Sequence, residues 1–568
     1  MTPKTEITYP AGVNLLDSAI QEQLNKLAGI NFVERFNQHD VTLWSSIQSD
    51  QDEVAHRLGW LDSAQNGVEL VKAASKLLKD VLSEGYTHAV VLGMGGSSLA
   101  PEVYSQFITT HGEEKKEYLV LSILDSTSPE QILNLEKRIP LDKTLFIVSS
   151  KSGTTVEVKT LFAYFWDQVS QVDAKHTGKH FIAISDPDTQ LQKLAVEKGF
   201  RQAFQADPNV GGRYSALIAF GLVPAVLAGY DGQMLLEQSL KISNAQSGNA
   251  ISMEDGGVQL GVVLGAAYQI GRDKLTLLAD APVEAMGSWI EQLVAESSGK
   301  EGKGIIPVDM EPLLPLDDYS DDRLFVHLRA DGHFDERVSE LTAANQPVFI
   351  CRMPGLYDLA AEFYRWEVAV AVACILMGVN AFNQPNVQES KDIAKQMLNV
   401  LKDGDELKMA APIWQDDVLA LYGESAHKHS SAQAYLKDFI AQGIHGDYIA
   451  LNAFIERNED NELKIEELRK NLTRATHLPT TLGFGPRFLH STGQLHKGGK
   501  NNGLFIVITQ DENQTLEIPD EGISFNNLIF AQGLGDTQAL EGHKRRVLRL
   551  HFTKNSFEET QLTELFRL

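Results

Sequence analysis

Residues 144–155 read TLFIVSSKSGTT, an apolar run that changes abruptly into a polar loop. The run 145–148 carries four large apolar side chains in succession, which is typical of a strand buried on both faces. The seven residues after it supply five hydroxyl groups, one lysine and one glycine. The stretch therefore predicts a buried strand whose carboxyl end opens into a loop rich in hydrogen-bond donors.

The same pattern occurs at three other places around this stretch. Apolar runs at 88–92 (HAVVL), 118–125 (YLVLSILD) and 180–186 (HFIAISD) each precede a turn cluster and a helical stretch. Such runs, alternating with helices, predict a parallel sheet with helices on both faces. The loops GMGGSS, DSTSPE, SSKSGTT and SDPDTQ would then share the carboxyl edge of the sheet, where ligands bind.

A second α/β pattern begins near Gly261 and continues through RLFVHLR and PVFICRM. We expect an α/β fold with two doubly wound parallel-sheet domains, a helical N-terminal segment and a C-terminal extension. The expected units are residues 1–60 (helical segment), 61–245 (first domain), 246–400 (second domain), 401–475 (a charged helical insertion) and 476–568 (a C-terminal segment that completes the second domain).

The composition narrows the classes of partner. A net charge of −26 disfavours nucleic-acid and anionic-membrane partners, so an anionic substrate would need a local cationic pocket. The two cysteines, Cys351 and Cys374, lie in apolar surroundings and argue against a disulfide framework. The N-terminus lacks a signal pattern, and the longest apolar stretch, 368–379, is too short to span a bilayer. We expect a cytoplasmic protein.

The loop after the strand at 144–150 has the chemistry of a phosphate site. A helix that follows a strand directs backbone amides toward an anion, hydroxyl groups add donors, and Lys151 adds a charge. An ordinary helix cap is the alternative, with Thr154 and Glu157 as a capping box. The loop GMGGSS at 93–98 has neither the nucleotide-fold glycine spacing nor a Walker lysine.

Taken together, three motifs carry a family resemblance. GMGGSSLAP (93–101), SSKSGTTVE (149–157) and VGGRYS (210–215) resemble the sugar-isomerase (SIS) fold of the phosphoglucose isomerases. The resemblance implies that the second loop grips a substrate phosphate and that the first faces the sugar. It places the phosphate contacts at Ser150, Lys151, Ser152 and Thr155, and the sugar-facing residues at Gly96 and Ser97.

Aldose–ketose isomerisation needs a carboxylate base, a cation for the developing oxyanion and a pair of groups that open the ring. It requires no metal or redox cofactor. The string AESSGK around Glu296 resembles the region of the family's catalytic glutamate, and VGGRYS places the cation at Arg213. A surface position for the glutamate and a structural ion pair for the arginine are the alternatives.

The remaining candidates lie further along the chain. GVNAFNQPNVQESK resembles a family pattern that implies ring opening by Lys391 and a pocket contact from Gln384. The family's LHS-x-GQ segment usually lies between the glutamate and the lysine, but here LHSTGQ occurs at 489–494. This order resembles the isomerase part of fused transaldolase and phosphoglucose isomerase chains, although no transaldolase barrel is evident. We expect His490 to open the ring, with His496 as the second choice.

The leading hypothesis is an isomerase that interconverts glucose 6-phosphate and fructose 6-phosphate through a cis-enediol(ate). The alternatives are a non-catalytic sugar-phosphate sensor and an isomerase of another hexose phosphate, such as mannose or amino-sugar phosphate. The expected partner is a small hexose phosphate, with no nucleic acid and no membrane. The resemblance implies a homo-oligomer, commonly a dimer with one histidine supplied across the interface, so whether His490 acts within its own chain is open.

Overall fold

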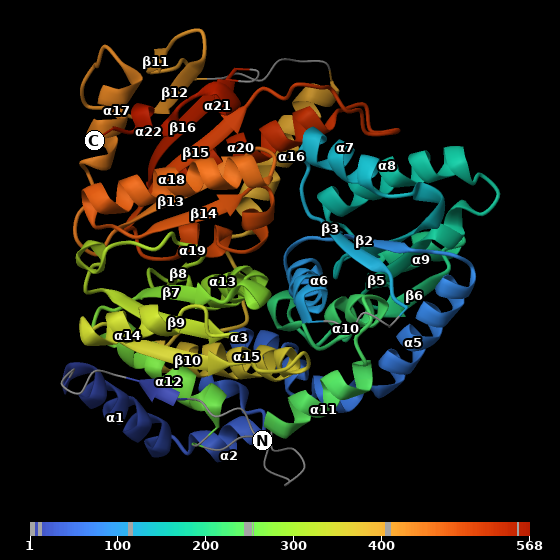
Figure 1. Cartoon of the computed structure of the whole chain (residues 1–568), viewed down its shortest axis with the longest axis horizontal. Coiled ribbons are helices and arrows are strands. Elements are labelled where there is room, and N and C mark those ends of the chain that lie inside the picture. Colours follow the sequence, from blue (N-terminus) through green and yellow to red (C-terminus); the bar gives the residue numbers. More distant parts are fainter. Residues whose placement is uncertain are drawn as a thin grey trace.

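The computed structural model describes residues 6–8, 14–111, 117–242, 253, 255–403, 410–553 and 556–567. The strands of these residues form three sheets. Figure 1 shows the first sheet on the right, the second at the lower left and the third at the upper left, with α13 (Ala285–Ser298) near the centre.

The first sheet has the predicted parallel arrangement. Its strand order is β3-β2-β4-β5-β6, with every neighbouring pair parallel. Along β4 (Thr144–Ser149), Leu145 and Ile147 enter one hydrophobic core while Phe146 and Val148 enter another. Both faces are therefore covered, as the apolar run predicts. The other elements are β2 (His88–Leu92), β3 (Val120–Leu124), β5 (Phe181–Ser185), β6 (Gln202–Gln205), α5 (Val68–Ser83), α6 (Leu99–His111), α7 (Pro129–Arg138), α8 (Val156–Val172), α9 (Gln190–Glu197) and α10 (Ala219–Leu227).

The second sheet has the order β1-β10-β9-β7-β8 and is parallel except for β1 (Glu6–Thr8), which pairs antiparallel with β10. Its remaining strands are β7 (Lys274–Ala279), β8 (Ile306–Val308), β9 (Arg323–Arg329) and β10 (Val348–Arg352). The buried helix α15 (Asp358–Met377) packs on α12 (Gly256–Gln269). A β-carbon at Gly261 would lie 2.5 Å from the carbonyl oxygen of Ala369, so a side chain there would force the two helices apart.

The N-terminal part is helical, with α1 (Asn14–Gly29), α2 (Phe32–Asn37) and α3 (Gln48–Ala55). Across the part of the chain that the structure describes, no helix combines the length and the apolar character needed to cross a bilayer.

The region beyond residue 410 differs from the expected insertion and C-terminal completion of the second domain. It forms a third sheet of its own, in the order β11-β12-β16-β15-β13-β14. The segment YIALNAF forms β13 (Tyr448–Phe454), and all seven of its residues are buried. The charged run at 456–470 mostly lies in α18 (Glu459–Thr476), whose residues Ile465 and Leu468 enter the core beneath. The other elements are β11 (Trp414–Gln415), β12 (Leu419–Gly423), β14 (Thr480–Phe484), β15 (Gly503–Gln510), β16 (Arg546–Phe552), α17 (Ala432–Ile440), α19 (Gly493–Gly498) and α20 (Phe525–Gly542). The helix α16 (Gln388–Lys402) precedes this region and packs on α20.

The central helix α13 joins the parts of the molecule. It contacts α6 of the first unit, α15 of the second and α19, which precedes β15 of the third sheet. Nearly all its residues are buried. A polar side chain on α13 is therefore held away from bulk water and can face segments that are far apart in the sequence.

Candidate active site

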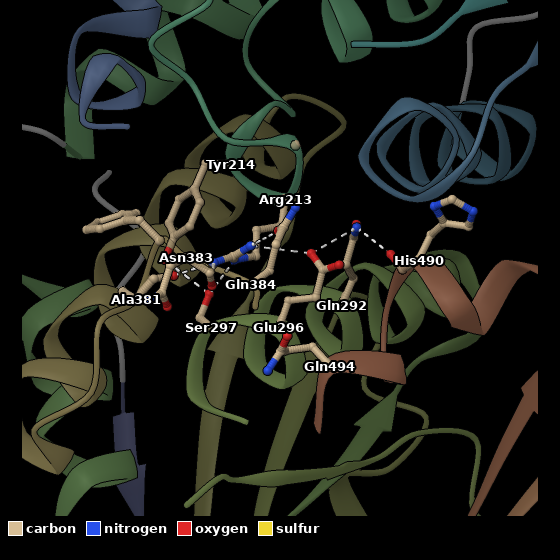
Figure 2. Close-up of polar contacts among 12 residues, drawn as sticks. Arg213, Tyr214, Gln292, Glu296, Ser297, Ala381, Asn383, Gln384, His490 and Gln494 are labelled. Carbon is tan, nitrogen blue, oxygen red and sulfur yellow. Dashed lines mark hydrogen bonds and ion pairs between the residues drawn. The ribbon is translucent and has the colours of Figure 1, made fainter. Parts of the chain in front are cut away.

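Arg213 is held rigidly in a buried position, with 2% of its surface exposed. Its Nη1 donates to Oε1 of Gln384 at 2.7 Å, and its Nε donates to the hydroxyl of Ser297 at 2.8 Å. Its Nη2 donates to the carbonyl oxygens of Ala381 at 2.5 Å and Asn383 at 3.2 Å. These acceptors fix the guanidinium plane, which leaves it oriented before any ligand arrives (Figure 2).

Glu296 lies beside this arginine near the end of α13. Its Oε2 is 3.5 Å from Nη1 of Arg213, and the residue is 5% exposed. Burial raises the pKa of Glu296 above its usual range, although the positive charges of Arg213 and Lys391 oppose the shift. A carboxylate of this kind accepts a proton more readily near neutral pH than an exposed one does, and the adjacent guanidinium can stabilise an oxyanion.

Gln292, one helical turn before Glu296, connects the carboxylate to the segment that carries His490. Its Nε2 donates to Oε2 of Glu296 at 3.4 Å and to the carbonyl oxygen of His490 at 2.7 Å. Figure 2 shows Gln292 between the two residues, with the His490 ring beyond it. The structure therefore brings the displaced histidine segment to the glutamate within one chain.

His490 pairs with a second carboxylate from the first unit. Its Nε2 lies 3.1 Å from Oε1 of Glu157. Burial and the charge of Lys391 lower the pKa of His490 below its usual range, while Glu157 opposes them. Burial alone would raise the pKa of Glu157, but the charge of His490 and its hydrogen bond outweigh burial, so the pKa of this carboxyl is lowered.

The contacts of Glu157 test whether the loop SSKSGTT ends in an ordinary capping box. Thr155 is the N-cap of α8, and its side chain makes no capping hydrogen bond. The Glu157 carboxylate faces His490 and also accepts from Nε2 of Gln532 at 2.8 Å. The Thr154 hydroxyl lies 2.9 Å from that of Ser152. The loop therefore does not use this glutamate as an ordinary cap.

Lys391 lies in the first turn of α16. Its charge lowers the pKa of Glu296, Glu157 and His490 below what burial and their other partners would set. The ammonium group of Lys391 therefore influences the charge of all three residues.

The predicted phosphate loop connects β4 to α8. The Ser150 hydroxyl lies 2.9 Å from that of Thr155, and Lys151 Nζ donates to Oδ2 of Asp186 at 2.6 Å. A cavity beside the loop is lined by Ser150 and Thr155, by apolar side chains, and by the charged residues Lys159, Lys193 and Glu197. Lys151 is thus tied to a carboxylate, while hydroxyl groups and two further lysines face the cavity.

The glycine loop after β2 packs directly on the arginine loop. A β-carbon on Gly96 would lie 1.9 Å from the carbonyl oxygen of Gly212, and the Ser215 hydroxyl donates to the carbonyl oxygen of Gly96 at 3.2 Å. Gly95, with φ +54°, leaves similarly little room beside the carbonyl oxygen of His490. Ser97 is 7% exposed in the same 3₁₀ turn.

The structure separates the two histidine candidates. The His496 ring packs 5.0 Å from Phe505 and 6.0 Å from Phe488, centroid to centroid. It is 3% exposed, and burial holds its pKa well below the usual range. His496 is surrounded by core, whereas His490 faces Glu157.

Lys300 is a site residue that the sequence did not single out. Its Nζ donates to the carbonyl oxygens of Asn380 at 2.7 Å and Asn383 at 2.6 Å. Burial lowers the pKa of Lys300 to about 7, and Arg213 adds to the shift. Lys300 and Arg213 both fix the segment that carries Gln384. Glu157 and Gln292 were not predicted as site residues from the sequence either. Only Lys300 had a sequence signal, because it belongs to the string ESSGK that begins at Glu296.

The equivalent edge of the second sheet is closed by the chain itself. Asp280, directly after β7, accepts from the backbone amides of Ala330 at 2.9 Å, Asp331 at 2.9 Å and Gly332 at 2.6 Å. His327 Nε2 lies 2.9 Å from its other oxygen. A nest of amides that could hold an anion is therefore already filled at this edge by a carboxylate of the chain itself.

Part of the chain is similar to a known protein family. Residues 46–304 match the family model described as phosphoglucose isomerase. The glucose-6-phosphate isomerase of Campylobacter jejuni is 26% identical over 417 residues, covering 64% of this chain and 98% of the relative. That of Staphylococcus saprophyticus is 26% identical over 441 residues, covering 67% of this chain and 96% of the relative.

Two solved structures share the fold. A protein from Thermus thermophilus, described as hypothetical protein TT0462, aligns with a TM-score of 0.55 and 21% identity, covering 70% of this chain and all of that one. A glucose-6-phosphate isomerase from Chlamydia trachomatis aligns with a TM-score of 0.53 and 16% identity, covering 70% of this chain and 89% of that one.

Proposed function

We propose that this chain, which belongs to the phosphoglucose isomerase family through residues 46–304, interconverts glucose 6-phosphate and fructose 6-phosphate. The reaction proceeds by ring opening and proton transfer between C1 and C2 through a cis-enediol(ate). The protein is thus an aldose–ketose isomerase. The matching relatives are glucose-6-phosphate isomerases nearly covered by the aligned region, which supports this assignment.

One observation carries the proposal: a buried carboxylate with a raised pKa, Glu296, lies 3.5 Å from a fixed guanidinium, Arg213. Proton transfer between adjacent carbons needs a base of this kind, and the enediolate oxygen needs a cation beside it. A protein that only binds sugar phosphate has no use for a base positioned over the carbons.

The remaining residues take the other steps. Glu296 removes the proton from one carbon and returns it to the next, and Arg213 stabilises the enediolate. His490, oriented by Glu157, and Lys391 exchange the protons that open the ring. Ser150, Lys151, Ser152 and Thr155 hold the phosphate, Gly96 and Ser97 face the sugar, and Gln384 contacts the bound substrate.

The proposal extends to assembly and location. A dimer and a cytoplasmic location are expected from the family resemblance. Because Glu157 and His490 meet within one chain, with 3.1 Å between Oε1 and Nε2, a monomer would already contain the proposed set of groups. Sedimentation of the purified protein, with activity measured across its concentration range, tests whether association changes turnover.

A coupled assay with fructose 6-phosphate and no added metal tests the function directly. We expect turnover, with solvent deuterium entering at C1 or C2 when the reaction is followed by NMR in D2O. Mannose 6-phosphate and glucosamine 6-phosphate serve as alternative substrates in the same assay. Faster turnover of either would change the substrate assignment, and binding of fructose 6-phosphate without exchange or turnover would indicate a sensor.

A further inference from the structure

A second polar cavity lies in the third unit, away from the residues assigned to the isomerase site. Tyr422 of β12, Gln538 and Glu541 of α20, and Arg549 of β16 line it. Its volume is about 690 Å³, within the roughly 300–1,000 Å³ of pockets that hold small molecules. The cavity is therefore large enough for a metabolite.

Arg549 is a buried cation at this cavity without an adequate counter-charge. It is 2% exposed, and its guanidinium lies 3.9 Å from the centroid of the Tyr422 ring. Its Nη1 donates to the Thr509 hydroxyl at 3.3 Å, and its Nε has no hydrogen-bond partner among the described residues. Among the described residues no carboxylate forms an ion pair with Arg549 within 4.0 Å, and Tyr422 and the charge of Glu541 offset only part of the effect of burial on its pKa. Burial of an unpaired guanidinium is costly, so this group lacks a partner that a ligand can supply.

Arg545, which lines the same cavity, also has a guanidinium nitrogen without a hydrogen-bond partner among the described residues. Its Nη2 donates to the carbonyl oxygens of Lys497 and of Gly499, the latter at 2.8 Å. Its Nε is buried and, within the described ranges, also lacks a partner. Burial lowers the pKa of both Arg545 and Arg549, as expected for cations whose charge is not fully compensated.

The charge of the lining is positive in a chain whose net charge is −26. Its charged members are Glu424, Glu541, Lys544, Arg545, Arg546 and Arg549. Arg546 is already paired, with Nη1 2.8 Å from Oδ2 of Asp447. The two glutamates leave an excess of positive charge on the wall, and the unpartnered Nε atoms belong to Arg545 and Arg549.

We propose that this cavity binds a small phosphate-bearing metabolite, with the phosphate at Arg549 and Arg545. A guanidinium group donates charge-assisted hydrogen bonds to an oxyanion, and two such groups suit the double charge of a phosphate. A monocarboxylate would satisfy only part of this charge. The inference does not depend on the isomerase assignment, because none of the residues that carry it, Tyr422, Arg545 and Arg549, is assigned to the proposed active site.

Isothermal titration with inorganic phosphate tests the site, using acetate as a monoanionic comparison. The parent chain for the titration carries Lys151→Ala and Ser152→Ala, which weakens phosphate binding at the proposed active-site loop. We expect the parent to bind phosphate more tightly than acetate, and Arg549→Gln to weaken phosphate binding roughly tenfold or more through loss of a charge-assisted contact.

Two further variants separate this site from general electrostatics. Gln538→Glu places a negative charge at an exposed position on the cavity wall and should weaken phosphate binding without disturbing the core. Arg546→Gln, the matched control, removes a charge already held by Asp447 and should change affinity less than about threefold. Absence of phosphate binding by the parent, or equal affinity in the parent and both the Arg549→Gln and Gln538→Glu chains, would overturn the proposal. If Arg549→Gln does not fold, Gln538→Glu decides the outcome.

Discussion

Gly96 and Gly212 lie in direct contact, so that a β-carbon added to Gly96 would be 1.9 Å from the carbonyl oxygen of Gly212. This contact joins the loop after β2 to the loop that carries Arg213. The glycine motif therefore has a packing role in addition to the sugar-facing role that its resemblance implies.

Gly96→Ala should displace the Gly212 loop and with it the guanidinium of Arg213. We expect kcat/KM to fall by at least roughly tenfold, and overpacking to destabilise the protein by about 1–3 kcal/mol. The coupled assay and a thermal melt measure the two effects. Gly29→Ala is the control, because a β-carbon there would meet no atom within 4 Å; equal behaviour of the two variants would show that the close contact is unimportant.

Glu296→Gln keeps the shape of the side chain but removes its ability to accept a proton. We expect kcat to fall by roughly two orders of magnitude or more, with little change in KM, as loss of a general base does. Steady-state kinetics with fructose 6-phosphate measure this. Glu301→Gln, at an exposed position five residues further on, should keep full activity. Normal turnover by Glu296→Gln would show that Glu296 is not the base.

Glu157→Gln should alter the pH dependence of activity. Glu157 raises the pKa of His490 against the effects of burial and Lys391, so removing its charge should lower that pKa further. Whichever form of His490 is active, the limb of the kcat profile that reports it should move to lower pH. NMR titration of the His490 ring checks the same shift directly, and an unchanged ring pKa would contradict the pairing.

Asp280→Asn should lower the stability of the second unit. Hydrogen bonds from His327 and the amide of Gly332 outweigh burial and hold the pKa of Asp280 below its usual range. A depressed pKa contributes stability that is fully present above the unfolded value of about 4 and is lost as pH falls below it.

The midpoint of thermal unfolding should therefore drop by roughly 5 °C or more at pH 7 in Asp280→Asn, and the difference from the unmodified chain should shrink below about pH 4. Asp317→Asn, at an exposed position, is the control and should melt as the unmodified chain does. A constant difference across this range would mean that the charge of Asp280 is not the source of its effect.

Much of the fold could be predicted because the relevant signals are local. The run at 145–148 fixes a strand covered on both faces, and its repetition fixes a parallel sheet. The third sheet was not predicted, although YIALNAF at 448–454 is as apolar as the runs that were recognised. It lies among polar segments, and its partner strands β14 and β15 begin about 30 and 55 residues later, so no local pattern indicated a separate sheet.

In the candidate site, too, local motifs were recognised and contacts between distant segments were not. Family motifs selected Arg213, Glu296, Gln384 and His490, and the structure brings them together, although their catalytic roles stay predictions. Sequence spacing predicted Thr154 as a local capping partner for Glu157, whereas its partner in the structure is His490, 333 positions away. Gln292 and Lys300 likewise act on segments distant in the chain, so their significance depends on packing that spacing alone does not encode.

The position of His490 has a consequence for biosynthesis. His490 precedes β15 and β16, which pair in the third sheet. Its partner Glu157 is synthesised 333 residues earlier. A nascent chain that has finished its first two sheets therefore carries the proposed base and the proposed phosphate loop before the proposed ring-opening residue His490 has been synthesised. If these roles hold, the complete set of proposed catalytic residues exists only late in translation, after residue 490.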